Sequence, residues 1–228
     1  MRGFLVALAA AAAAIAVSGC GAAVTPLEPG TLASRPLART AKEQTQEDLK
    51  AAGLAVVVGR GAVLYHGRGF PGRVFFAAVE GGGGEDFVLG PQSTQHRMSR
   101  AVLLWPARVR AGAYRIVGME GGNPKQKLTI GLNRPEAAKT LLRSGLPPDL
   151  VLAPGDVAHL GQIRGVAERG RKPYLELLST EADLEEATEA LAWAFPKIAA
   201  EPERGRLSCA LCLISKLRSQ LDRAPADR

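Results

Sequence analysis

The strongest constraint on the fold is the pattern of apolar and turn-forming residues between positions 54 and 178. Short apolar runs alternate there with Gly and Pro turn signals, and no long amphipathic helix separates consecutive runs. Short runs at this spacing predict β-strands, and the connections favour antiparallel pairing. The sequence therefore predicts a mainly β chain, built as an antiparallel β-sandwich. The expected strands are 54–58, 62–66, 73–80, 87–89, 101–105, 113–120, 126–132, 150–152, 157–163 and 174–178.

Two glycine-rich segments suggest turns between these strands. Gly59-Arg60-Gly61 suits a hairpin connection between the first two runs. Four glycines, Gly81 to Gly84, precede Glu85 and Asp86. A phosphate-binding loop of the Walker type needs Gly-Lys-Ser/Thr at the start of a helix, so this segment predicts a flexible hairpin tip instead.

Two short helices are expected outside the strands. Thr40 followed by Glu43 fits a capping box and predicts a short polar helix within residues 40–53. Residues 135–144 begin with Pro and are followed by Gly145, which predicts a short insert helix.

Residues 179–228 contain two apolar stripes at helical spacing and form a predicted helical extension. The first helix should end near Phe195, because Pro196 follows, and the second should run from about Leu207 to Asp222. Packing on the protein's own core is the default expectation, with a partner or a membrane surface as alternatives. The overall class is then α+β.

The N-terminal residues 1–19 have the organisation of a signal peptide. Arg2 supplies the positive charge, and an Ala-rich apolar stretch shorter than a typical membrane span leads to Val17-Ser18-Gly19-Cys20. This segment resembles the signal and lipobox of bacterial lipoproteins. The resemblance implies that Cys20 carries diacylglycerol through a thioether, becomes the first mature residue, and gains a fatty acyl chain such as palmitate on its amine.

The resemblance also implies a location in the cell envelope. Acyl chains contribute about 0.8 kcal/mol per buried methylene, so Cys20 would anchor the protein to a membrane without a spanning helix. Residues 20–39 are rich in Pro and small side chains and predict a flexible tether. Gly21 follows Cys20 where lipoproteins retained in the inner membrane of enteric bacteria usually carry Asp. For a Gram-negative source, the resemblance therefore favours the outer membrane, facing the periplasm.

Two further runs carry a second resemblance. Residues 108–117 (RVRAGAYRIV) look like the strand-turn-strand signature of transthyretin-like or carboxypeptidase-regulatory-like β-sandwich modules. Residues 152–163 (LAPGDVAHLGQI) resemble a strand common in envelope lipoproteins that carry such a module. The resemblance covers residues 54–178 and implies a non-enzymatic envelope domain with no settled biochemical role.

The charge distribution indicates no nucleic-acid partner. The chain has 29 basic and 22 acidic residues, and loss of the signal peptide removes only Arg2 from the basic set. The densest basic group, Arg164, Arg169, Arg171 and Lys172, has no aromatic stacking platform among it. A modest, scattered excess of positive charge is typical of a solvated surface.

Cys209 and Cys212 are the only cysteines besides Cys20. In an oxidising envelope an even pair predicts a local disulfide. A thiol-disulfide exchange site is the alternative, although no thioredoxin-like βαβ pattern surrounds the pair. A zinc site would need further ligands, and His66, His96 and His159 are scattered in sequence. We expect no metal and no cofactor.

No catalytic constellation is recognisable in the sequence. There is no Gly-x-Ser-x-Gly elbow, and His159 on a predicted strand reads as a structural histidine. The sequence therefore predicts a non-enzymatic, lipid-anchored module that supports or binds another envelope protein. Two alternatives stay open: an envelope thiol-disulfide protein using Cys209 and Cys212, and a carrier that holds an apolar ligand in a cavity.

Overall fold

The structure is a computed structural model that describes part of the chain. The described residues are 42–90, 105–123, 126–131, 145–178, 181–198, 203–204 and 207–221. Cys20 with its lipobox, the tether and the insert helix predicted at 135–144 lie outside these residues.

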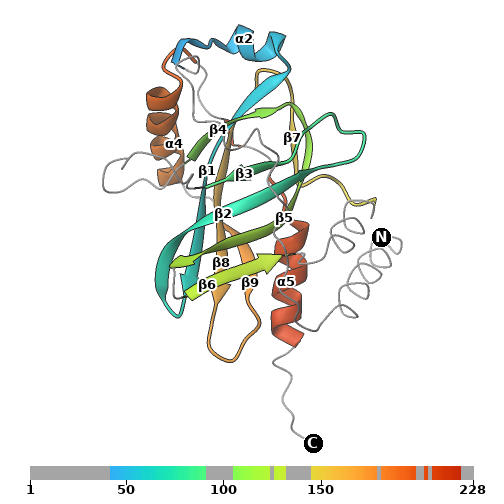
Figure 1. Cartoon of the computed structure of the whole chain (residues 1–228), viewed down its shortest axis with the longest axis vertical. Helices are drawn as coiled ribbons and strands as arrows, with labels where there is room; N and C mark the ends of the chain where they lie inside the picture. Colours follow the sequence, from blue (N-terminus) through green and yellow to red (C-terminus); the bar gives the residue numbers. More distant parts are fainter. Residues whose placement is uncertain are drawn as a thin grey trace, which may run out of the picture.

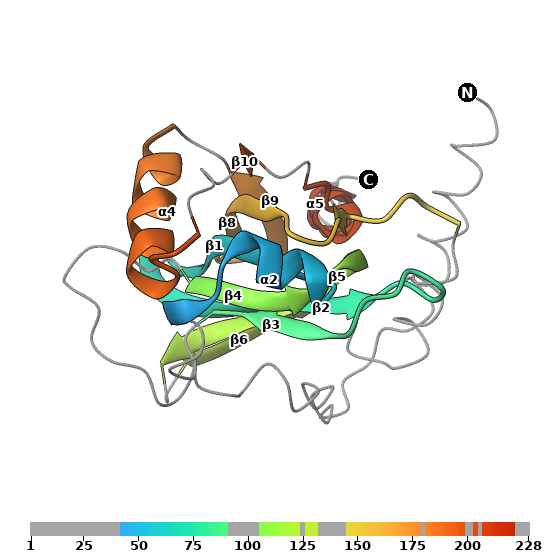
Figure 2. The same ribbon diagram turned by 90° about the horizontal axis from the view of Figure 1, so that it is seen from above.

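The strands form one mixed sheet. The strands are β1 (Leu54–Tyr65), β2 (Arg68–Ala78), β3 (Phe87–Leu89), β4 (Trp105–Arg110), β5 (Gly112–Asn123), β6 (Gln126–Gly131), β7 (Leu150–Leu152), β8 (Val157–Ala167), β9 (Tyr174–Leu178) and β10 (Glu203–Arg204). Figure 1 labels β1 to β9, and Figure 2 also labels β10. Their order in the sheet is β10-β8-β1-β2-β5-β6, while β9 flanks β8, β4 flanks β1, β3 flanks β2 and β7 flanks β5. The sheet curls, so that β8 and β9 lie over β3 and β6 when the molecule is seen from above (Figure 2).

The predicted mainly β class is confirmed, but the predicted antiparallel sandwich is wrong. All ten strands belong to one sheet, and two of its pairings are parallel. In the larger one, Val56 of β1 lies opposite Val157 of β8. A parallel pair needs a long crossover connection, usually a helix. Here the described part of the connection consists of the strands β2 to β7, so the parallel pairing does not follow from a simple strand–helix–strand pattern in the sequence.

The hairpin predicted at Gly59-Arg60-Gly61 is also wrong, because β1 runs unbroken through it with a bulge opposite β8 between Val58 and Arg60. A Cβ atom on Gly61 would lie 2.3 Å from the carbonyl oxygen of Gly72. Glycine is therefore needed for close backbone approach rather than for a turn. The turn comes later, at His66 and Gly67, whose φ angles are 46° and 80°. Positive φ at both central residues is typical of a two-residue hairpin turn.

The start of β1 is apolar on both faces because both faces are covered. Ala55 and Val57 belong to the main core inside the curled sheet, which also contains Phe76 of β2. Val56 and Val58 belong to a second core on the other face. All four of these β1 residues are 0% exposed. A strand buried on both sides reads as a continuous apolar run, as this one does.

The glycine tetrad lies between the antiparallel strands β2 and β3, as expected of a hairpin connection, and it also packs against β5. Ala113 N donates to the Gly82 carbonyl oxygen at 3.1 Å. A Cβ atom on Gly112 would lie 2.4 Å from the nitrogen of Gly84. The following acids are engaged as well: Asp86 Oδ1 accepts from Ala78 N at 2.8 Å, and Glu85 pairs with Arg110 at 2.9 Å.

The first described α-helix is α2 (Gln46–Ala51), which starts later than we predicted. Its capping box uses Thr45 and Asp48 instead of Thr40 and Glu43: Thr45 Oγ1 accepts from Asp48 N at 3.2 Å, and Thr45 N donates to Asp48 Oδ2 at 2.9 Å. Asp is as suitable an acceptor at this position as the Glu of the usual motif, so either pair fits the sequence rule. Leu49 of this helix is fully buried in the second core.

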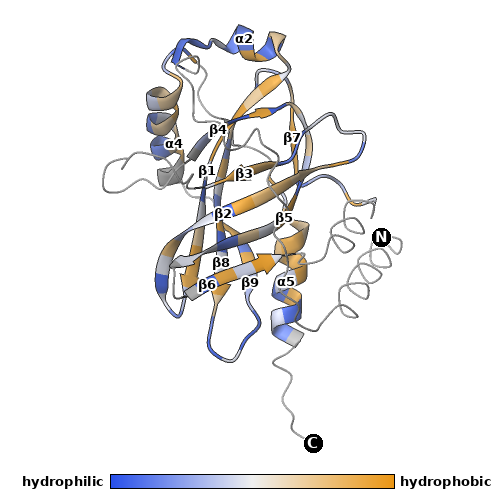
Figure 3. Ribbon diagram, viewed as in Figure 1, coloured by the Kyte–Doolittle hydropathy of each residue, from blue (hydrophilic) through white to orange (hydrophobic). Residues whose placement is uncertain are grey.

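Two C-terminal helices pack on the sheet from opposite sides of the molecule (Figure 2). Helix α4 (Glu181–Ala194) ends before Pro196, as predicted, and covers the second core with Leu191 and with Phe195 just beyond its end. Helix α5 (Ala210–Leu221) places Leu211 in the main core; it is apolar at its start and hydrophilic toward its end (Figure 3). Neither helix, nor α2, has the length and apolar character needed to span a membrane.

Candidate functional site

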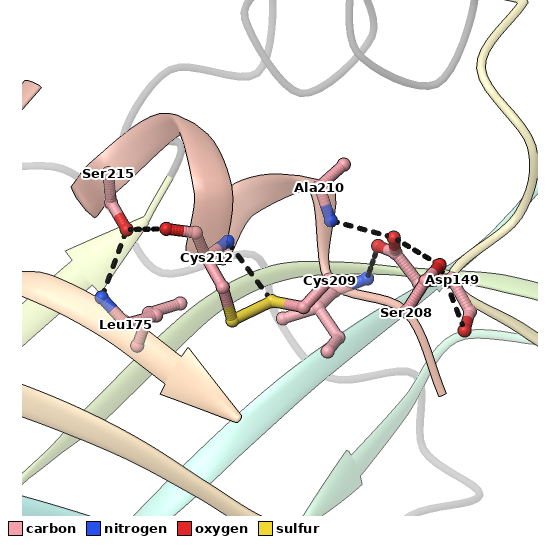
Figure 4. Close-up of a disulfide and its surroundings, with 8 residues drawn as sticks. Asp149, Leu175, Ser208, Cys209, Ala210, Cys212 and Ser215 are labelled. Atoms are coloured by element: carbon pink, nitrogen blue, oxygen red, sulfur yellow. Dashed lines mark hydrogen bonds between the residues drawn. A yellow bond between two sulfur atoms is a disulfide. The ribbon is translucent and has the colours of Figure 1, made fainter. Parts of the chain in front are cut away.

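The candidate site is the disulfide between Cys209 and Cys212 at the start of α5 (Figure 4). The two Cα atoms lie 5.1 Å apart. Cys209 occupies the N-cap position: its carbonyl oxygen accepts from Leu213 N at 3.2 Å, and its sulfur accepts from Cys212 N at 3.0 Å. N-cap side chains usually offer an oxygen from Ser, Thr, Asp or Asn for this bond. Here a sulfur takes that role.

The two cysteines differ in their exposure to solvent. Cys212 is 8% exposed and belongs to the main core. Cys209 is half-buried and packs at the margin of that core. Cys209 is therefore the more exposed of the two cysteines.

Asp149 fixes the start of the helix to the sheet. Its Oδ1 accepts from Ala210 N and its Oδ2 accepts from Ile116 N of β5, each at 2.9 Å. Its carbonyl oxygen accepts from Ser208 N at 2.8 Å. The side chain is 1% exposed, so a single buried carboxyl joins β5 to α5.

Burial dominates the electrostatics of this carboxyl. Desolvation raises the pKa of Asp149, because the charged form loses its hydration. The hydrogen bonds from Ala210 N and Ile116 N, the positive charge of Arg115 and the Ser208 hydroxyl act in the opposite direction. Arg115 is itself 1% exposed, and its Nη2 donates to the carbonyl oxygens of Leu146 and Pro147 at 2.7 and 3.1 Å.

Ser215 holds the same helical turn from the other side. Its Oγ donates to the Cys212 carbonyl oxygen at 3.1 Å and accepts from Leu175 N of β9 at 2.9 Å. The disulfide thus sits on a turn that is fixed to both β5 and β9, a rigid setting for any chemistry at the sulfurs.

Comparison of the chain with protein-family models, with curated proteins and with solved structures gives no match. The resemblances to bacterial lipoproteins and to transthyretin-like modules therefore stay predictions.

The structure brings Cys209 and Cys212 together but separates the other candidates. His66 lies in the β1–β2 turn, whereas His159 is 2% exposed within β8; His96, like Cys20, falls outside the described residues. In the described ranges, no group of three His, Cys, Asp or Glu side chains is placed to hold a metal ion.

Asp149 is the residue that sequence reasoning missed. Its side-chain partners Ile116 and Ala210 are 33 and 61 positions away. Local spacing rules detect partners three or four residues apart, so no local signal could reveal these contacts.

Proposed function

We propose that the protein is a lipid-anchored module of the bacterial cell envelope that binds another envelope protein. The observation that carries the proposal is the segment Val17-Ser18-Gly19-Cys20 behind a short apolar stretch with Arg2 at its start. A thioether-linked diacylglycerol and an amide-linked acyl chain on Cys20 would give stable membrane attachment.

The spacing between the anchor and the folded domain supports this arrangement. In the sequence, 21 residues, three of them Pro, lie between Cys20 and Lys42, the first residue that the structure describes. A coil of that length spans roughly 25 Å, enough to keep a domain clear of lipid headgroups.

An interaction role is supported by large apolar side chains on the outer surfaces of the two C-terminal helices. Trp193 of α4 is 48% exposed, and Leu217 of α5 is 41% exposed. Exposed Trp is enriched at the centres of protein interfaces. We take the α4 surface around Trp193 as the first place to look for a partner.

The anchor is tested by producing the full chain in a bacterium with an outer membrane and feeding it a labelled fatty acid. We expect label and membrane attachment in the wild type, and loss of both in Cys20→Ser. Cys209→Ser is the matched control and should keep them. An unlabelled wild-type protein, or a labelled Cys20→Ser protein, would refute the lipid anchor.

The partner is tested with a photo-crosslinking residue placed at Trp193, with the exposed Arg68 in the β1–β2 hairpin as the control position. We expect one reproducible envelope protein to be captured from position 193 and not from position 68. Equal, unselective capture from both positions would contradict the interaction role.

A further inference from the structure

The sulfur of Cys209 occupies a position built for an anion. As the N-cap atom it receives the N–H of Cys212, and it lies at the positive end of a 12-residue helix. A disulfide sulfur is a weak hydrogen-bond acceptor, whereas a thiolate is a strong one. The site therefore interacts better with the reduced Cys209 than with the oxidised pair.

From this geometry we propose that Cys209 and Cys212 are a redox-active pair that accepts two electrons from the dithiol of another protein. A helix N-terminus that stabilises the thiolate product makes the disulfide easier to reduce. This activity is independent of the lipid anchor and goes beyond the binding role proposed above.

A purely structural role explains the pair less well. Stabilisation by a disulfide grows with the length of chain that it closes, and these cysteines are only three positions apart. The surrounding contacts already fix the turn, through Asp149 on one side and Ser215 on the other. The disulfide therefore adds little constraint that the fold lacks.

The difference in burial assigns the two roles. A thiolate of the substrate attacks Sγ of Cys209, the more exposed cysteine; the S–S bond breaks, and its electron pair leaves on Cys212 Sγ. The second substrate thiolate then attacks its neighbour in the mixed disulfide and releases Cys209 as a thiolate. The substrate dithiol becomes a disulfide, the protein gains two electrons, and the two protons lost by the substrate thiols balance those needed by the two cysteines.

The surface beside Cys209 indicates the class of substrate. Leu213, on the same first turn of α5, is 49% exposed, and Ser208 is exposed before the helix. An apolar side chain beside an accessible sulfur favours a polypeptide dithiol with apolar neighbours over a small hydrophilic thiol. We infer that the substrate is a protein segment with two cysteines and apolar residues near them.

The test uses the full-length chain with Cys20→Ser, so that Cys209 and Cys212 are its only cysteines. Adding Cys212→Ser leaves Cys209 alone, and adding Cys209→Ser leaves Cys212 alone. At pH 7 we expect the Cys209 thiol to react with an aromatic disulfide reagent at least about tenfold faster than the Cys212 thiol. In concentrated urea the two rates should become equal. Equal rates in the folded proteins, or a faster Cys212, would overturn the proposal.

A second measurement needs neither single-cysteine variant. The oxidised Cys20→Ser chain is mixed with a peptide that contains two cysteines flanked by leucines. We expect one peptide disulfide to form per protein molecule, and Leu213→Ser to slow this reaction but not the reaction with glutathione. A peptide that stays reduced would overturn the redox role. Equal rates for Leu213→Ser and the parent would overturn the substrate class alone.

Discussion

The carboxylate of Asp149 accepts a hydrogen bond from the backbone nitrogen of Ala210, 2.9 Å away and 61 positions later in the chain. Through its second oxygen it holds Ile116 of β5. One buried side chain thereby sets where α5 begins and where the neighbouring disulfide lies.

Replacing Asp149 with Ala should lower the free energy of unfolding by about 3 kcal/mol, because two buried N–H groups lose their acceptors at about 1–3 kcal/mol each. Asp156→Ala is the matched control: this partly buried aspartate caps a turn by accepting from Ala153 N at 2.7 Å, and its loss should cost about 1 kcal/mol. Urea unfolding measures both. Equal losses in the two variants would contradict the role assigned to Asp149.

The pH dependence of stability should carry the signature of a raised carboxyl pKa. Since burial raises the pKa of Asp149 in the folded state, the folded protein binds its proton more tightly than the unfolded chain does. The stabilisation that comes from this tighter proton binding is therefore complete below the ordinary pKa of 3.8. It is lost as pH rises through the pKa of Asp149 in the folded protein. The wild type should be more stable than Asp149→Asn at pH 3.8, and the difference between their free energies of unfolding should become smaller as pH rises toward neutrality. A gap that widens over this range would show a lowered pKa instead.

Gly61→Ala should be strongly destabilising, by about 3 kcal/mol, because its Cβ would lie 2.3 Å from the Gly72 carbonyl oxygen and force the two strands apart. Gly69→Ala, in the partner strand β2, has nothing within 4 Å of the new Cβ and should change stability by less than about 0.5 kcal/mol. Thermal unfolding of the two variants provides the comparison. Similar melting temperatures would refute the close-approach explanation.

Reduction of the disulfide should cost only about 2 kcal/mol of unfolding free energy, because the closed loop is so short. Urea unfolding with and without a reductant measures the difference on the same chain. A decrease in the free energy of unfolding of more than about 4 kcal/mol would mean that the disulfide is a main source of the stability of the fold.

The sequence predicts the strands well where an element is bounded by turn residues. Residues 87–89, 150–152 and 174–178 are strands with the expected limits, and Pro196 marks the end of α4 as expected. These outcomes depend on local chemistry: period-two alternation, glycine turns and the missing N–H of proline. Local signals of this kind are visible in a single sequence.

The arrangement of the strands could not be predicted in the same way. The parallel pairing of β1 with β8 joins residues about a hundred positions apart. The glycines at 59 and 61 have the spacing of a turn in the sequence, but in the structure they allow close packing within the sheet. The same holds for the candidate site. The spacing of the two cysteines is visible in the sequence, but the contact of the buried Asp149 with the start of α5 is not. Long-range contacts leave no local pattern.

The bulge between Val58 and Arg60 affects how β1 can pair with other chains before β8 has been synthesised. β1 is synthesised first among the strands, yet its partner β8 arrives some ninety residues later, and pairings so distant form slowly. Until then its open edge is a template for pairing with other chains. A bulge interrupts regular backbone pairing along that edge. The bulge that lets β1 pair with β8 thus makes the exposed edge of β1 a poor template for aggregation with other chains.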